Sequence, residues 1–171
     1  MKPISDFFEQ ELRWVHPRWL SNVYELRGGN ELLATARLEG PFRSQALVET
    51  AEGGWTIVRK GLRQSIAVVQ TGSHEEAATL KRGMSGKVTL LLPGEQGFQW
   101  SCTSFWRDIW SWCTNEGTPL LHLTRGSRVQ LEPAARELPE PELALLTTLG
   151  WYLHKLQEED AAAASIVPVI S

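Results

Sequence analysis

Hydrophobic and polar positions follow two different periods along this chain. Between residues 10 and 132, apolar residues come in short runs rich in β-branched and aromatic types. Turn sequences separate these runs about every ten or eleven residues. Between residues 141 and 156, the sequence PELALLTTLGWYLHKL is apolar on nearly every side. The first pattern predicts strands, and the second predicts a helix that must be buried all round.

The apolar runs predict about twelve strands. Turn sequences such as GGN at residues 28–30 and PGE at residues 93–95 supply the positive φ angles and preset bends that tight hairpins need. The predicted strands span residues 10–16, 20–27, 31–39, 45–51, 55–60, 65–70, 75–82, 87–92, 98–103, 108–114, 119–124 and 128–132. Strands joined by such short turns form a meander of antiparallel hairpins.

The predicted helix covers residues 141–157 and begins where Pro139 and Pro141 end a loop. Its length of roughly 22 Å fits strands of six or seven residues, which stand roughly 16 to 18 Å tall when tilted in a barrel. A sheet of about twelve strands also encloses more volume than its own side chains fill. We therefore expect a mainly β fold, a closed antiparallel barrel that encloses a hydrophobic C-terminal α-helix. Gly150, in the middle of the helix, is expected to touch the wall.

Composition narrows the function classes. The 171 residues fit a single domain, which we place at residues 1–160, followed by a tail at 161–171 that is expected to be frayed or to pack its apolar end on a surface groove. A net charge of −3 gives no general basic field, so nucleic acid is not an expected partner. The N-terminus has no features of a secretory signal, and the apolar helix is too short to span a bilayer. These features predict a cytoplasmic protein without a transmembrane span.

The segment LSNVYELRGGNELLATARLEG at residues 20–40 and the segment FQWSCTSFWRDIWSW at residues 98–112 precede the terminal apolar helix. In this combination the chain resembles the tubby C-terminal-like superfamily, which includes tubby proteins, phospholipid scramblases and plant LURP-one-related proteins. It is most similar to small prokaryotic members with no assigned activity. The resemblance implies a twelve-stranded barrel threaded by a hydrophobic helix.

The same resemblance implies association with membrane lipid, because tubby domains bind phosphoinositides through basic side chains and scramblases act at membranes in a calcium-linked way. The chain has no acidic calcium loop that matches. Basic side chains clustered at turns can bind lipid phosphates, although the overall acidity of the chain favours the simpler interpretation of a solubilising turn and a charged strand end. The residues expected to form an anionic-lipid site are Arg59, Lys60, Arg63, Lys81 and Arg82, with Arg43 as a possible addition.

The tryptophan-rich segment at residues 98–112 has two interpretations. It can be an aromatic platform for a ligand or a membrane interface, or it can be core that packs against the helix, which we favour. Arg107 and Asp108 at its turn are expected to form a loop ion pair. Cys102 and Cys113 lie on adjacent predicted strands, where a disulfide is conceivable but two packed thiols are favoured.

No catalytic constellation stands out in the sequence. The four histidines have no Ser, Cys or Asp at a triad spacing, although triads assemble in space, and no zinc spacing is present. The leading hypothesis is a non-enzymatic binding module without a cofactor, whose partner is an anionic phospholipid surface or a protein. The alternatives are an intracellular carrier of a small apolar ligand, which requires a cavity, and an enzyme of unrecognised type, which requires a cleft with convergent polar groups.

Overall fold

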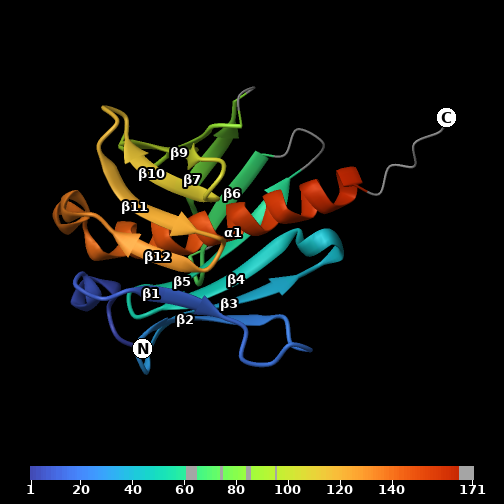
Figure 1. The fold of residues 1–171 in the computed structure, drawn as a ribbon, viewed down its shortest axis with the longest axis horizontal. Coiled ribbons are helices and arrows are strands. Elements are labelled where there is room, and N and C mark those ends of the chain that lie inside the picture. Colours follow the sequence, from blue (N-terminus) through green and yellow to red (C-terminus); the bar gives the residue numbers. More distant parts are fainter. Residues whose placement is uncertain (61–64, 74, 84–85, 95, 166–171) are drawn as a thin grey trace.

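Twelve antiparallel strands close into a barrel around one long helix (Figure 1). The computed structural model describes residues 1–60, 65–73, 75–83, 86–94 and 96–165. The strands are β1 (Leu12–Val15), β2 (Val23–Gly28), β3 (Glu31–Glu39), β4 (Gln45–Thr50), β5 (Gly53–Lys60), β6 (Ser65–Gln70), β7 (Glu76–Arg82), β8 (Val88–Leu91), β9 (Gly97–Ser104), β10 (Ile109–Thr114), β11 (Pro119–Thr124) and β12 (Arg128–Leu131). Each overlaps one of the predicted strands, and the predicted fold class is confirmed.

The barrel is a simple meander in which each strand pairs with its neighbours in sequence. It closes where β1 pairs with β12, through Leu12 opposite Val129 and Arg13 opposite Arg128. Short 3-10 helices lie at Ile4–Phe7 (η1), Pro41–Arg43 (η2) and Pro133–Glu137 (η3). Because successive hairpins turn at alternate ends, the connections after odd-numbered strands share one end of the barrel.

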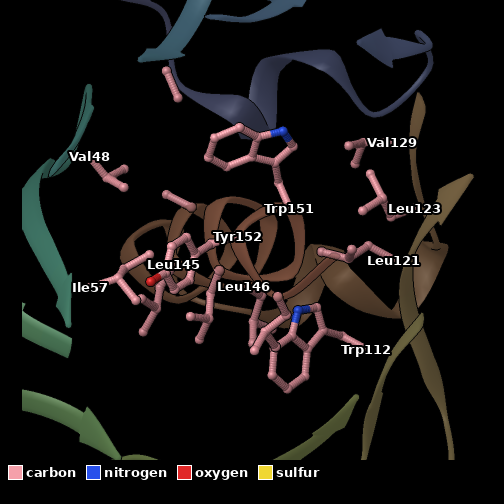
Figure 2. Close-up of a cluster of buried hydrophobic side chains, with 14 of the residues drawn as sticks. Val48, Ile57, Trp112, Leu121, Leu123, Val129, Leu145, Leu146, Trp151 and Tyr152 are labelled. Atoms are coloured by element: carbon pink, nitrogen blue, oxygen red, sulfur yellow. The ribbon is translucent and has the colours of Figure 1, made fainter. Parts of the chain in front are cut away.

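The single α-helix, α1 (Glu140–Ser165), fills the barrel interior. Figure 2 shows its side chains directed toward opposite walls, with Leu145 and Tyr152 near Ile57 and with Trp151 on another side. The Trp151 ring stacks on that of Trp14 of β1, with centroids 4.6 Å apart. An apolar helix without a polar face is therefore explained by a wall on every side.

Gly150 lies where the backbone of α1 packs directly against the wall. A Cβ atom at this position would lie 2.8 Å from Cζ3 of Trp100 and 2.9 Å from Nε1 of Trp112, which is closer than side chains tolerate. Both tryptophans are completely buried. The predicted contact between Gly150 and the wall is present, and the core interpretation holds for these two tryptophans.

The helix is longer than the sequence predicted. It ends at Ser165 instead of near residue 157, so its 26 residues reach about 39 Å at 1.5 Å per residue. The extra turns contain Ala161 to Ala164, and alanine is the strongest helix former. The first residues of the predicted tail are thus an exposed helical extension, and residues 166–170, the predicted groove-packing segment, lie outside the described residues.

Cys102 and Cys113 are both free thiols, but the expectation of two packed thiols is wrong for Cys102, whose side chain is exposed, while Cys113 is half-buried. Cys102 pairs with Trp110 across the β9–β10 hairpin, whereas Cys113 pairs with Gln99. Three residues along a strand separate the two cysteines by about 10 Å, which exceeds the roughly 7 Å that a disulfide can bridge.

Candidate functional site

The two ends of the barrel carry opposite charge. We call the end where α1 emerges the basic rim; it consists of the last residues of β5 and β7 and of the described residues in the connections β1–β2, β3–β4, β7–β8, β9–β10 and β11–β12. Among its described connecting residues, five are basic and one is acidic. The basic residues are Arg18, Arg43, Lys87, Arg107 and Arg125, and the acidic residue is Asp108. The opposite end is the acidic rim, whose described connecting residues include Glu52, Glu75, Glu116, Glu132, Glu137 and one base, Arg136.

Exposed apolar side chains gather at the same end as the positive charge. In the part of the chain that the structure describes, seven large hydrophobic residues are exposed, and five of them belong to basic-rim connections: Trp19, Leu20, Phe42, Phe105 and Trp106. Trp106 is 94% exposed and Phe42 is 89% exposed, and the Trp106 ring meets the equally solvent-facing Phe105 ring edge-on, with centroids 5.9 Å apart. The core interpretation of the tryptophan-rich segment is therefore wrong for Trp106, which lies at the tip of the β9–β10 hairpin.

Left-handed backbone conformations also occur at this end. Among the described residues, the non-glycine residues with positive φ are Phe42, Arg43, Asp108 and Arg125, and all belong to basic-rim turns. Side chains larger than glycine adopt this region reluctantly, and such residues are found disproportionately at functional sites. Two of these residues, Phe42 and Arg43, follow one another in the β3–β4 connection, where the exposed Phe42 ring lies beside Arg43.

The basic residues predicted from the sequence divide into two sets. Lys60 and Lys81 are exposed on the outer face at the ends of β5 and β7, whereas Arg59 and Arg82 are half-buried. Side chains alternate along a strand, so Arg59 and Arg82 are directed toward the barrel mouth and α1. Arg63 lies outside the described residues. Arg59 is therefore not a freely exposed side chain, because every second residue at this end of β5 faces the helix.

The C-terminal turns of α1 form ion pairs with the rim. Nε of Arg43 lies 3.0 Å from Oε1 of Glu159, and a guanidinium nitrogen of Arg82 lies 3.4 Å from Oδ2 of Asp160. The hydroxyl of Tyr152 donates a hydrogen bond of 3.0 Å to the main-chain carbonyl of Arg43. These contacts fix the emerging helix to the β3–β4 and β7–β8 hairpins.

Burial dominates the titration of the two acidic groups at this mouth. It raises the pKa of the Tyr152 phenol strongly, while the positive charge of Arg59 opposes the shift. It also raises the pKa of the Glu159 carboxyl, against the attraction of Arg43 and Arg59, each of which favours the carboxylate. Arg43 and Arg59 thus both act on the Glu159 carboxylate.

Asp108 and His154 join the β9–β10 hairpin to α1. The predicted Arg107–Asp108 ion pair is wrong: Asp108 accepts hydrogen bonds from Nε1 of Trp110 at 3.0 Å and from Nε2 of His154 at 3.1 Å. His154 is buried, with its ring under Gly126 of the β11–β12 connection. His154 therefore holds the β9–β10 and β11–β12 hairpins against the helix.

A chain of polar side chains crosses the outer wall, and sequence reasoning missed it. The Ser111 hydroxyl lies 2.5 Å from Nδ1 of His122, and Nε2 of His122 lies 3.0 Å from Glu132. Ser111 lies in β10, His122 in β11 and Glu132 directly after β12, so no sequence spacing reveals them. Ser111 is fully buried in a hydrogen-bonded strand, where a substrate carbonyl cannot reach its oxygen. The arrangement is suited to joining strands and not to nucleophilic catalysis.

The described cavities bear on the carrier hypothesis. A pocket of about 160 Å³ lies at the acidic rim between β5, β6 and the start of α1, lined by Trp55, Val68 and Leu145 among others. A cavity of about 150 Å³ holds one benzene-sized molecule. A larger hollow of about 750 Å³ lies over β3 to β5, with Thr35, Arg37 and Leu47 in its lining. Only the smaller pocket lies beside the central helix, and it offers room for a small ligand.

The fold defines a class of protein, a closed twelve-stranded antiparallel barrel whose interior is filled by its C-terminal helix. No family model, curated protein or solved structure matches the chain, so the resemblance to the tubby C-terminal-like superfamily stays a prediction. In the described part of the chain, no helix is long and apolar enough to cross a membrane, and no group of three or more potential metal ligands occurs.

Proposed function

We propose that the protein is a binding module that docks through its basic rim on a membrane surface containing anionic lipid. The observation that carries the proposal is the coincidence of positive charge and fully exposed aromatic rings at one end of the barrel, with negative charge at the other end. Aromatic rings are favoured at the membrane interface, and basic residues near an anionic leaflet each contribute about 1 kcal/mol.

The charge distribution also specifies an orientation. The acidic rim is repelled by the surface that attracts the basic rim, so the barrel axis should stand across the membrane plane with α1 emerging toward the lipid. Phe42, Phe105 and Trp106 then enter the interface while the basic side chains contact phosphates. An expected cytoplasmic location fits this proposal, because the cytoplasmic leaflet carries the anionic lipids.

Sedimentation with liposomes tests the proposal. Wild-type protein should sediment with vesicles containing phosphatidylserine and not with pure phosphatidylcholine vesicles, and binding should weaken as salt rises because exposed charges are screened over about 10 Å at 0.1 M ionic strength. Equal sedimentation with both vesicles, or none with either, would contradict the proposal.

A matched pair of variants tests the orientation. Lys60→Gln combined with Lys81→Gln removes two exposed positive charges from the basic rim, and at about 1 kcal/mol each it should weaken binding about 30-fold. Gln70→Glu combined with Gln96→Glu changes the net charge equally, but on exposed residues near the acidic rim. The control should bind almost as well as the wild type. Equal losses in the two variants would mean that only net charge matters.

A second pair separates the apolar contribution from the charge. Phe105→Ser combined with Trp106→Ser removes two exposed rings without changing charge, and binding to anionic vesicles should fall. Leu91→Ser removes an exposed apolar side chain of β8 at the opposite end and serves as the control. Because all three side chains are exposed, the variants should fold normally.

A further inference from the structure

Acidic side chains of α1 lie at the basic rim, where positive charge would otherwise dominate. Glu158, Glu159 and Asp160 follow one another at the point where the helix leaves the barrel. Arg43 pairs with Glu159 at 3.0 Å, Arg82 pairs with Asp160 at 3.4 Å, and Nζ of Lys155 lies 2.7 Å from Glu158. Several of the charges that would attract a lipid surface are therefore already neutralised within the chain.

This part of the helix is held by charge and not by apolar burial. Leu156 is the last residue of α1 in the buried core, and the alanines and serine from residue 161 to residue 165 are exposed. The side chains in the Arg43–Glu159 and Arg82–Asp160 pairs keep between 24% and 47% of their surface accessible. Exposed ion pairs of this kind contribute little stability and exchange readily with other ions. The last turns of α1 are consequently its least firmly held part.

The surroundings of the Glu159 carboxylate resemble an anion site. Nε of Arg43 lies 3.0 Å from this carboxylate. Burial raises the pKa of the carboxyl, and the positive charges of Arg43 and of Arg59, which belongs to a different hairpin, oppose that shift. The Arg43 guanidinium that pairs with this carboxylate can pair equally with a phosphate, because both anions present oxygens to its N–H groups. Glu159 thus occupies a place that suits the phosphate group of a lipid.

We propose that the carboxylates of Glu159 and Asp160 occupy, in the free protein, the anion site that a phospholipid phosphate occupies on the membrane, so that docking releases the last turns of α1 from the rim. The inference rests on the proposed function, since it describes how the same rim exchanges an internal anion for an external one. Because the two anions compete for the same arginines, a change that stabilises the ion pairs of Glu159 and Asp160 weakens lipid binding. By linkage, bound lipid in turn weakens these ion pairs.

Neutral, isosteric replacements test the competition. Glu159→Gln combined with Asp160→Asn frees Arg43 and Arg82 from these partners and should raise the affinity for phosphatidylserine vesicles about tenfold. Glu116→Gln combined with Glu137→Gln makes the same change in net charge on exposed residues of the acidic rim and should leave affinity within about twofold of the wild type. Equal gains in both variants, or no gain at Glu159 and Asp160, would overturn the inference. Circular dichroism and the melting temperature verify that each variant is folded.

Hydrogen exchange of the wild-type protein tests the release directly. Amides of residues 157–165 should exchange about tenfold faster when anionic vesicles are bound, while neutral vesicles should leave their exchange unchanged. If wild-type protein binds anionic vesicles but these amides do not exchange faster, the inference is wrong and the proposed function stands. If wild-type protein binds no anionic vesicles, the proposed function itself is wrong. Faster exchange with inorganic phosphate alone would overturn the lipid assignment, because it would identify free phosphate as the ligand of the site.

Discussion

At the scale of single residues, close packing between the central helix and the wall decides which side chains are allowed. Gly150 is the clearest case, because Trp100 and Trp112 occupy the space that any Cβ atom would need. Alanine is a better helix former than glycine by about 1 kcal/mol, so propensity and packing act in opposite directions at this position. Overpacking a tight core costs about 1 to 3 kcal/mol.

We expect packing to outweigh propensity. Gly150→Ala should lower the free energy of unfolding, by up to about 2 kcal/mol after the gain in helix propensity is subtracted. Urea denaturation measures this change. A variant as stable as the wild type would show that the two tryptophan rings can move aside.

Glu142, in the first turn of α1, shows the cost of a half-buried carboxylate. One of its oxygens is buried and has no hydrogen-bond donor among the described residues, and burial raises the pKa of the carboxyl above its ordinary value. A carboxyl whose pKa is raised by folding destabilises the fold once it is charged. This penalty is absent below the unfolded pKa and grows as pH rises through the raised value.

Glu142→Gln should therefore raise the melting temperature at pH 7, and the advantage should shrink as pH falls through the region around 4.5. Thermal melts at several pH values provide the measurement. The exposed Glu137→Gln is the control and should change the melting temperature little. A gain for Glu142→Gln that does not depend on pH would rule out ionisation as its cause.

At the scale of elements, α1 is stabilised mainly by burial in the core of the barrel. Its Leu149 is completely buried, and the surrounding positions from Leu143 to His154 are buried as well. An isolated helix of this composition has no stable face in water, whereas inside the barrel every side finds an apolar neighbour (Figure 2).

Leu149→Asp should unfold the protein or leave it insoluble. Burying an unpaired charge costs several kcal/mol, and the whole stability of a domain is about 5 to 15 kcal/mol. Ala163→Asp introduces the same side chain at an exposed position of the same helix and should remain folded. Soluble expression and circular dichroism distinguish the two, and a folded Leu149→Asp variant would contradict a core role for the helix.

At the scale of the whole molecule, barrel and helix share one hydrophobic core. The same cluster contains Leu12 and Trp14 of β1, residues of every other part of the wall, and Leu156 near the end of the core segment of α1. The first strand, β1, pairs with the last, β12, and this pairing closes the barrel. Neither the helix nor the open sheet has a core of its own.

Unfolding should consequently be a single cooperative transition. Tryptophan fluorescence reports on the buried Trp100, Trp112 and Trp151, and far-ultraviolet circular dichroism reports on the backbone. The two signals should give the same midpoint in urea. Separate midpoints would mean that the helix leaves the barrel before the strands come apart.

The sequence by itself determined the number and positions of the strands, the buried character of the helix and the contact of Gly150 with the wall. These features follow from short-range patterns, because alternation, turn residues and an apolar run act over a few neighbouring positions. The sequence missed the length of α1, since the apolar pattern ends before the helix does and the alanine-rich turns continue it.

Only the tertiary structure decided how the candidate site is composed. Barrel closure brings six hairpins, separated by long stretches of chain, to the end where α1 emerges, and it gathers their basic and aromatic residues there. It also turned Arg59 toward the helix and Lys60 toward solvent, paired Asp108 with His154 and placed Ser111 beside His122. Such contacts depend on strand register and on which end each turn occupies, and these are set by the packing of the whole barrel and not by any local pattern.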